Sequence, residues 1–223
     1  MSRADRIRLD LHLHTRGSFD CLSDPEAVLA RAVAGGVHRI AITDHNRLDV
    51  ALRMASAHPD QVIPGEEVKT AEGVDVIGLY LSEEIPEGTP GVETCRRIRE
   101  QGGLVYLPHP YAAGKGGSGR WAEEWIGDVD VVEAYNGRIH DQRLNDRARH
   151  LAQSNGLPMG AGSDAHTLWE VARCQTEVPA HANEPRALLE ALAEAVIHGR
   201  SSPHLVHVAS TWAKVRKRLP GAG

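Results

Sequence analysis

Histidines and acidic residues gather in five short segments of this 223-residue sequence. Each segment follows a run of aliphatic residues and places its polar residues one or a few positions apart. Neutral imidazoles and carboxylates together form a donor set that suits zinc, manganese and iron. The segments are His12-x-His14 with Asp20, Thr43-Asp44-His45, Gly65-Glu66-Glu67, Pro108-His109-Pro110, and Gly162-Ser163-Asp164-Ala165-His166. This donor set favours a site with more than one metal ion.

The aliphatic runs before these segments indicate strands that alternate with helices. Gly and Pro residues separate the runs, and helical patterns lie between most of them. We expect seven strands, at residues 7–12, 38–43, 61–64, 74–81, 104–107, 130–134 and 159–161. We expect helices at residues 23–34, 48–57, 91–101, 141–155 and 184–198. Seven strands at the spacing of βα units predict one α/β barrel, built like a TIM barrel.

In such a barrel the loops that follow the strands lie on one face, and that face carries the active site. Five separate segments would therefore bring histidines and acids to one rim. Residues two apart on an extended chain point to the same side. His12 and His14 should thus face the same site, and so should Asp164 and His166.

Composition limits the class of protein. The 13 histidines exceed the sum of Phe, Tyr, Trp and Met, whereas the three cysteines are scattered and form no CxxC pair. The formal charge of −5 argues against a protein that coats nucleic acid, although it allows a small phosphorylated substrate. The sequence has no long apolar run and no apolar leader, so we expect a cytoplasmic protein without a membrane span. Nothing in the sequence indicates an oligomeric state.

The chain should divide near residue 200. Residues 1–200 are expected to form the barrel, and Ser201-Ser-Pro203 interrupts the pattern. Residues 201–223 would then be a tail that packs on the barrel or extends from it. Within this tail we expect a strand or an extended arm at residues 204–208 and a short basic helix at residues 211–219.

The ordered motifs resemble the PHP domain (polymerase and histidinol phosphatase) family. The matching stretches are DLHLHT at 10–15, Asp20, TDH at 43–45, PGEE at 64–67, LPHP at 107–110, VEAYNGR at 132–138 and GSDAH at 162–166. Members of that family fold as a distorted (β/α)7 barrel, bind up to three metal ions and hydrolyse phosphate esters. The resemblance therefore implies an α/β fold of this kind and a metal-dependent phosphoesterase.

The resemblance also implies which residues bind the metal ions. The ligands of one ion would be His12, His14, Glu67 and Asp164, and those of a second Asp20, His45 and His166. Glu67 would also reach toward a third ion with His109. The family's Gly-x-Glu spacing selects Glu67, because Glu66 would point to the opposite side of an extended chain. Asp75 stands where the family usually has a histidine and is a further candidate ligand.

The reaction that the resemblance implies needs catalytic residues and a basic side chain for the phosphate. Asp164, Glu67 and Arg138 are the candidate catalytic residues. Arg138 is also the first candidate for phosphate binding, because the motif that contains it ends at the same rim and arginine holds phosphate through two parallel hydrogen bonds. Arg16, Lys115 and Arg120 are further candidates for phosphate binding. Asp44 is expected to orient the neighbouring His45 ring.

The predicted activity is hydrolysis of a phosphate ester by water that two or three divalent ions (Zn, Mn or Fe) activate. The substrate would be a small phosphorylated metabolite, a nucleotide or a short oligonucleotide. Two alternatives stay open at this point. One is an amidohydrolase-like enzyme that cleaves C–N or lactone bonds, since such barrels also begin with His-x-His. The other is a metal-stabilised module that binds a ligand or partner without catalysis.

Overall fold

The computed structural model describes residues 6–114, 116–203 and 206–218. These residues form a nine-stranded sheet with the order β7-β6-β5-β4-β3-β2-β1-β8-β9. The strands are β1 (Arg6–Leu13), β2 (Arg39–Ile42), β3 (Val62–Lys69), β4 (Asp75–Leu79), β5 (Leu104–Leu107), β6 (Val131–Asn136), β7 (Met159–Gly162), β8 (Cys174–Pro179) and β9 (Val196–Gly199). The seven strands expected from the sequence correspond to β1–β7.

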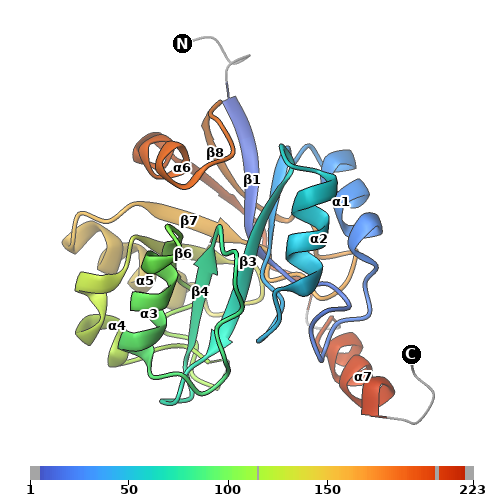
Figure 1. Ribbon diagram of the computed structural model, residues 1–223, viewed down its shortest axis with the longest axis horizontal. Helices are drawn as coiled ribbons and strands as arrows, with labels where there is room; N and C mark the ends of the chain where they lie inside the picture. Colours follow the sequence, from blue (N-terminus) through green and yellow to red (C-terminus); the bar gives the residue numbers. More distant parts are fainter. Residues whose placement is uncertain (1–5, 115, 204–205, 219–223) are drawn as a thin grey trace.

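The sheet curls until the end of β7 meets the end of β1 (Figure 1). There the Asp164 amide donates a hydrogen bond to the His12 carbonyl at 2.7 Å, and the His14 amide donates to the Ala165 carbonyl at 2.9 Å. The sheet is therefore a nearly closed, distorted barrel, as predicted. The contact also brings two of the predicted ligand segments side by side through their backbones.

Strand β4 departs from the parallel pattern. Strands β1, β2 and β3 are parallel, as are β5, β6 and β7, but β4 is antiparallel to both β3 and β5. A short turn at residues 70–74 joins β3 to β4, and Lys69 pairs in register with Asp75. Asp75 consequently starts its strand at the rim where β3 ends. An antiparallel β4 thus still brings its first residue to the rim that carries the predicted ligands.

Helices cover the outside of the barrel, with α1 and α2 near β1–β3 and α3–α5 on the side of β4–β7 (Figure 1). Aliphatic residues from these helices and the strands form one buried cluster. A second cluster, which contains Leu9, Leu11 and Tyr106, fills the barrel and includes Leu188 of α6. The helices are α1 (Pro25–Ala34), α2 (Asp49–Ala57), α3 (Gly91–Glu100), α4 (Trp121–Glu124), α5 (Gln142–Ser154), α6 (Pro185–Ala191) and α7 (Val206–Arg218), with 3-10 turns at Ile126–Asp128 and Leu192–Glu194.

The C-terminal quarter differs from the sequence prediction. The helix expected at 184–198 ends early as α6. Val196–Gly199 instead forms β9, which pairs with β8, and neither of these two strands was predicted. Strand β8 alternates buried and half-buried residues, so its side chains have the period of a strand. The extended arm expected at 204–208 is wrong from Val206 onward because α7 begins there, while residues 204–205 lie outside the described part. No helix among the described residues is long and apolar enough to span a bilayer.

Candidate metal centre

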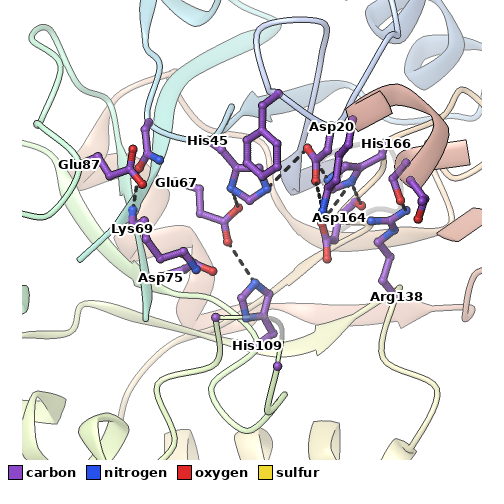
Figure 2. Close-up of a pocket in the computed structure, with 17 residues that line it drawn as sticks. Asp20, His45, Glu67, Lys69, Asp75, Glu87, His109, Arg138, Asp164 and His166 are labelled. Carbon is purple, nitrogen blue, oxygen red and sulfur yellow. Dashed lines mark hydrogen bonds and ion pairs between the residues drawn. The ribbon is translucent and has the colours of Figure 1, made fainter. Parts of the chain in front are cut away.

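Four of the predicted ligands, His12, His14, Glu67 and Asp164, form a compact group at the rim where β1, β3 and β7 end. Figure 2 shows two of them, Glu67 and Asp164, among the residues that line the pocket there. The Nε2 atom of His14 lies 3.4 Å from Glu67 Oε2 and 3.3 Å from Asp164 Oδ1. The Nε2 atom of His12 lies 3.2 Å from that of His14 and 3.4 Å from Glu67 Oε2. The donor atoms of His12, His14 and Asp164 are all within 4.8 Å of one another, so they could hold one ion.

A second group adjoins the first. The Nε2 atom of His166 lies 3.2 Å from Asp20 Oδ1, and that of His45 lies 3.8 Å from the same oxygen. Ring centroids of His14 and His45 are 4.4 Å apart, and those of His14 and His166 are 4.2 Å apart. His14, His45 and His166 can also converge on one ion. His14 therefore lies where the two groups adjoin.

Glu67 connects the groups. Its Oε2 atom lies 3.0 Å from His45 Nδ1, and its Oε1 atom lies 3.1 Å from His109 Nε2. His12, Glu67 and His109 form the third set of donor atoms close enough to hold an ion. Glu66 faces away from this centre, and its Oε2 atom accepts a hydrogen bond from the Ile85 amide at 2.9 Å. The alternation expected of an extended chain therefore separates the two glutamates.

The donor atoms are buried, and several lack hydrogen bonds. Among the described residues, Asp20 Oδ1, Glu67 Oε2 and His109 Nδ1 are inaccessible and have no hydrogen-bond partner. Leaving a buried polar atom without a partner costs about 1–3 kcal/mol, and more for a charged group. A divalent ion bound by carboxylate oxygens and imidazole nitrogens would satisfy such atoms, so the residues present fit a metal centre.

Electrostatics within the group favour charged carboxylates. Burial opposes ionisation of Glu67 and Asp164, but the surrounding histidines hold both pKa values well below the usual range. Burial together with His166 and His45 lowers the pKa of His14 to about 3, so His14 is neutral. A neutral imidazole between ionised carboxylates is the form that binds a metal ion.

The backbone is strained at two of the ligands. His109 and Asp164 have φ values of 28° and 53°, a region that residues other than glycine rarely adopt. Asp164 follows β7, and the hydrogen bond from its amide to β1 holds this conformation. Strain of this kind persists where the surrounding structure enforces it and is concentrated at functional sites.

Glu133 of β6 supports the centre from outside the ligand set. Its Oε1 atom lies 3.0 Å from His12 Nδ1, and its Oε2 atom accepts from the His109 amide at 2.7 Å and from Asn136 Nδ2 at 2.9 Å. Sequence reasoning assigned no role to Glu133, although the residue lies within the VEAYNGR motif. The signal that could have identified it is an acidic residue in the middle of a predicted strand of aliphatic residues, where the structure places it buried.

Asp44 does not orient His45 as expected. Its carboxylate accepts hydrogen bonds from the amides and hydroxyls of Thr15 and Ser18. The Ser18 hydroxyl lies 3.0 Å from His14 Nδ1. Asp44 therefore shapes the loop after β1 and acts on His14 through Ser18, because its side chain points toward β1 rather than toward its neighbour in sequence.

Asp75 is paired with Lys69 at the edge of the centre, as Figure 2 shows. Asp75 is 2% exposed, and burial together with Glu67 raises its pKa to about 6. Asp75 belongs to none of the donor groups that the described residues form and that could hold an ion. Lys69, which sequence reasoning missed, lies two residues after Glu67 on β3. This spacing places both side chains on one face and could have identified it.

The candidate phosphate-binding residues lie in different places. Arg138 lines a cavity that opens over the donor groups, but it is only 6% exposed. Its Nε and Nη2 atoms donate hydrogen bonds to Glu170 at 2.7 Å and to Ser210 at 3.1 Å. Arg16 pairs with Asp24 at 2.9 Å, and Arg120 lies over the Trp121 ring, and neither lines the cavity. Lys115 lies outside the described residues.

A cavity of about 410 Å³ opens over the donor groups. Its wall includes Asp20, His45, Glu67, Asp75, His109, Asp164 and His166. Helix α7 adds Ser210, Thr211 and Lys214 to this wall. Sequence reasoning did not place the C-terminal helix at the site, since a basic helical stretch is most often a solvated face.

Comparison with known proteins is consistent with this geometry. Residues 10–97 match the PHP domain family, and residues 142–197 match the PHP-associated family. The uncharacterized protein MJ0417 of Methanocaldococcus jannaschii is 37% identical over 170 residues, which cover 74% of this chain and 68% of that protein.

Two solved structures share the fold. A two-domain protein from Bacteroides vulgatus that contains a predicted PHP-like metal-dependent phosphoesterase superposes with a TM-score of 0.69 at 19% identity. The match covers 87% of this chain but only 65% of that one. A lesion-specific endonuclease from Pyrococcus furiosus superposes with a TM-score of 0.64 at 14% identity, covering 86% of this chain and 57% of that one. Taken together, the two family matches, the close relative and the fold show that the chain belongs to the PHP domain family, a family of metal-dependent phosphoesterases.

Proposed function

We propose that the chain hydrolyses phosphate esters of small substrates with a centre of two divalent metal ions. One ion would be held by His12, His14, Glu67 and Asp164. The second would be held by Asp20, His45 and His166, with Glu67 Oε2, 3.0 Å from His45 Nδ1, between the two. The observation that carries this proposal is the convergence of imidazoles and buried carboxylate oxygens, two of which have no hydrogen-bond partner among the described residues, beneath one cavity.

The residues at the edge of the cavity near His109 favour a centre of two ions rather than three. His12, which completes the donor group with Glu67 and His109, would already bind the first ion. A third ion would therefore need a further donor, and Asp75 is the residue placed to supply it. The Lys69 ammonium already occupies the Asp75 carboxylate. A fixed cation there satisfies the acid and repels a further cation, so Asp75 would serve to hold Lys69 in the cavity wall.

When bound, divalent ions would lower the pKa of a water molecule and offset charge on the phosphoryl oxygens. The chain's own residues prepare the centre for this. Glu133 fixes the His12 ring, Asp44 and Ser18 fix His14, and the histidines keep Glu67 and Asp164 ionised. Asp164 and Glu67 thus remain our candidates for catalytic residues. Arg138, paired with Glu170, would act mainly by holding the wall in place.

The substrate we propose is a small phosphorylated metabolite, a nucleotide or a short oligonucleotide. A cavity of about 410 Å³ suits a small ligand, and the chain's formal charge of −5 provides little general attraction for long nucleic acid. The lesion-specific endonuclease with the same fold keeps a short nucleic acid among the candidates. Zinc, manganese and iron all suit a donor set of nitrogen and oxygen without thiolate.

Elemental analysis followed by a phosphate-release screen tests this function. Purified protein should contain two manganese, zinc or iron ions per chain and release phosphate from phosphomonoesters or short oligonucleotides, with metal removal abolishing turnover. Amide and lactone substrates belong in the same screen, because turnover of those alone would favour the amidohydrolase alternative. Bound metal without turnover of any substrate would favour a binding module and contradict the proposal.

A further inference from the structure

Helix α7 is fixed against the barrel at both of its ends. Near its start, the Ser210 hydroxyl accepts a hydrogen bond from Arg138 Nη2 at 3.1 Å. Near its end, Lys217 Nζ donates to the carbonyls of Arg16 and Ser18, the former at 2.6 Å. Arg16 and Ser18 belong to the loop that carries Asp20. The helix is therefore tied to two walls of the cavity rather than lying free on the surface.

The buried face of α7 has helical spacing. Val206, Ser210 and Ala213 are 4%, 7% and 3% exposed, which is the i, i+4, i+7 pattern of a packed face. Lys214 is next to this face and half-buried, and Thr211 lies one turn earlier on the same edge. Both line the cavity. The packing thus determines which basic residue of the tail reaches the centre.

Lys214 lies directly at a predicted metal ligand. Its Nζ atom is 3.5 Å from Asp20 Oδ2 and 5.1 Å from the centre of the Phe19 ring. Asp20 is 5% exposed, and its other carboxylate oxygen faces His166. A lysine ammonium beside a buried carboxylate supplies the positive charge that a metal ion would otherwise supply.

Lys214 would change its partner once a divalent ion binds Asp20. The ion and the Lys214 ammonium would then lie a few Å apart, and like charges at that separation repel. An anionic group placed between them removes the repulsion and gains a charge-assisted hydrogen bond from the ammonium. Because α7 is held at both ends, Lys214 stays at the cavity while it exchanges Asp20 for such an anion.

We propose that Lys214 binds a phosphoryl oxygen of the substrate in the metal-loaded protein, and that α7 is a substrate-binding element of the site. This inference rests on the proposed function and names the residue that selects a tetrahedral oxyanion. A lysine suits the task because its ammonium is a mobile point charge with three donors. Thr211 lies on the same wall and lengthens the polar surface that faces the anion.

Inorganic phosphate is the probe that tests the inference on the manganese-loaded full chain. Lys214→Met should leave the manganese content unchanged and weaken phosphate binding, measured by calorimetry, roughly 10-fold or more. Lys214→Arg should retain most of the affinity because it keeps a cation that donates hydrogen bonds. Arg218→Met is the matched control, since Arg218 is exposed on α7 and does not line the cavity. That control should bind phosphate like the wild type.

A second readout separates substrate binding from support of the fold. With p-nitrophenyl phosphate, Lys214→Met should raise KM about 10-fold with a small change in kcat, while its Tm stays near that of Arg218→Met. Unchanged phosphate affinity and KM in Lys214→Met would overturn the inference and leave the proposed function standing. Loss of manganese from Lys214→Met would also overturn it. Absence of metal from the wild type would instead contradict the proposed function.

Discussion

The Glu133 carboxylate joins His12 and His109, two predicted metal ligands that are far apart in the sequence. One of its oxygens lies 3.0 Å from His12 Nδ1, and the other accepts a hydrogen bond from the His109 amide at 2.7 Å. This leaves Nε2 of His12 directed toward Glu67 and Asp164. An acid outside the donor groups thus determines which ring nitrogen of His12 faces the metal centre.

Replacing Glu133 should therefore weaken metal binding. Glu133→Gln removes the charge that stabilises the correct tautomer of His12, and substitutions in such supporting residues lower metal affinity or activity about 10–100-fold. Manganese titration by calorimetry measures the effect. Glu177→Gln serves as the control, because Glu177 lies on β8 and does not line the cavity. Equal manganese affinity in both variants would show that Glu133 does not support the centre.

Replacement by glutamine should affect metal binding differently at Glu66 and Glu67, the two neighbouring glutamates of β3. Glu67→Gln removes an oxygen shared by the donor groups, so we expect loss of at least one ion per chain and a fall in turnover of about 100-fold or more. Glu66→Gln keeps the acceptor for the Ile85 amide and faces away from the centre, so it should retain both ions. Elemental analysis of the two variants provides the comparison. Retention of both ions in Glu67→Gln would contradict the assignment.

The number of ions should depend on Lys69 and Asp75. Wild-type protein should hold two ions per chain, because the Lys69 ammonium occupies the Asp75 carboxylate. The double variant Lys69→Met, Asp75→His removes this cation and supplies an imidazole, so it should hold a third. Native mass spectrometry counts the ions directly. Three ions in the wild type would show that the ion pair opens on metal binding and that Asp75 is itself a ligand.

Arg138 should contribute to stability through its ion pair. Its Nε atom donates to Glu170 at 2.7 Å, and Glu170 is completely buried. Arg138→Met would remove the cation of this ion pair and leave the carboxylate with only its hydrogen bonds from the His166 amide and the Thr167 hydroxyl. Breaking a buried ion pair in this way typically costs about 3–5 kcal/mol. Urea unfolding measures this loss. Arg149→Met, which breaks an exposed pair with Asp146, should cost less than about 1 kcal/mol. Similar unfolding free energies for the two variants would rule out a supporting role for Arg138.

Metal affinity should increase with pH. Burial lowers the pKa of His45, but Glu67 and Asp20 outweigh burial and raise it to about 9. Below that pH a divalent ion must displace a proton from the ring, so affinity should rise with pH toward about 9. In the metal-free protein the same proton stabilises the fold. That stabilisation is complete below the usual value of 6.5 and disappears as the pH rises through about 9.

Calorimetry in buffers with different protonation enthalpies tests this prediction. Manganese binding near neutral pH should release protons, and the apparent heat should change from one buffer to another in proportion to that release. A heat that does not depend on the buffer, together with constant affinity between about pH 6 and pH 9, would show that His45 is already neutral.

The sequence predicted the positions of the ligand segments because strand ends are local features. His12 and His14 follow an alternating strand, and Asp164 and His166 follow a short one, so both pairs could be placed at one rim. The selection of Glu67 over Glu66 rested on the resemblance to the family's Gly-x-Glu spacing, and the two-residue period of the strand places Glu66 on the opposite side. The structure bears out the convergence of these side chains, while their binding of metal stays a prediction.

Other features depended on contacts between distant segments and were missed. Glu133 supports His12 across the barrel, and Lys69 meets Asp75 only because β4 runs antiparallel to β3. Lys214 reaches Asp20 through the packing of α7, which no periodic pattern within the tail predicts. Strands β8 and β9 were missed because they do not follow the βα repeat: β8 pairs antiparallel with β1, and β9 pairs antiparallel with β8.

Anomalous diffraction from crystals grown with manganese would show directly whether two metal ions bind at the predicted ligands. We expect two strong peaks beneath the cavity, one among His12, His14, Glu67 and Asp164 and the other among Asp20, His45 and His166. Lys69 and Asp75 should stay paired without a peak between them. No peak at these residues, or manganese bound only elsewhere on the surface, would contradict the proposed metal centre.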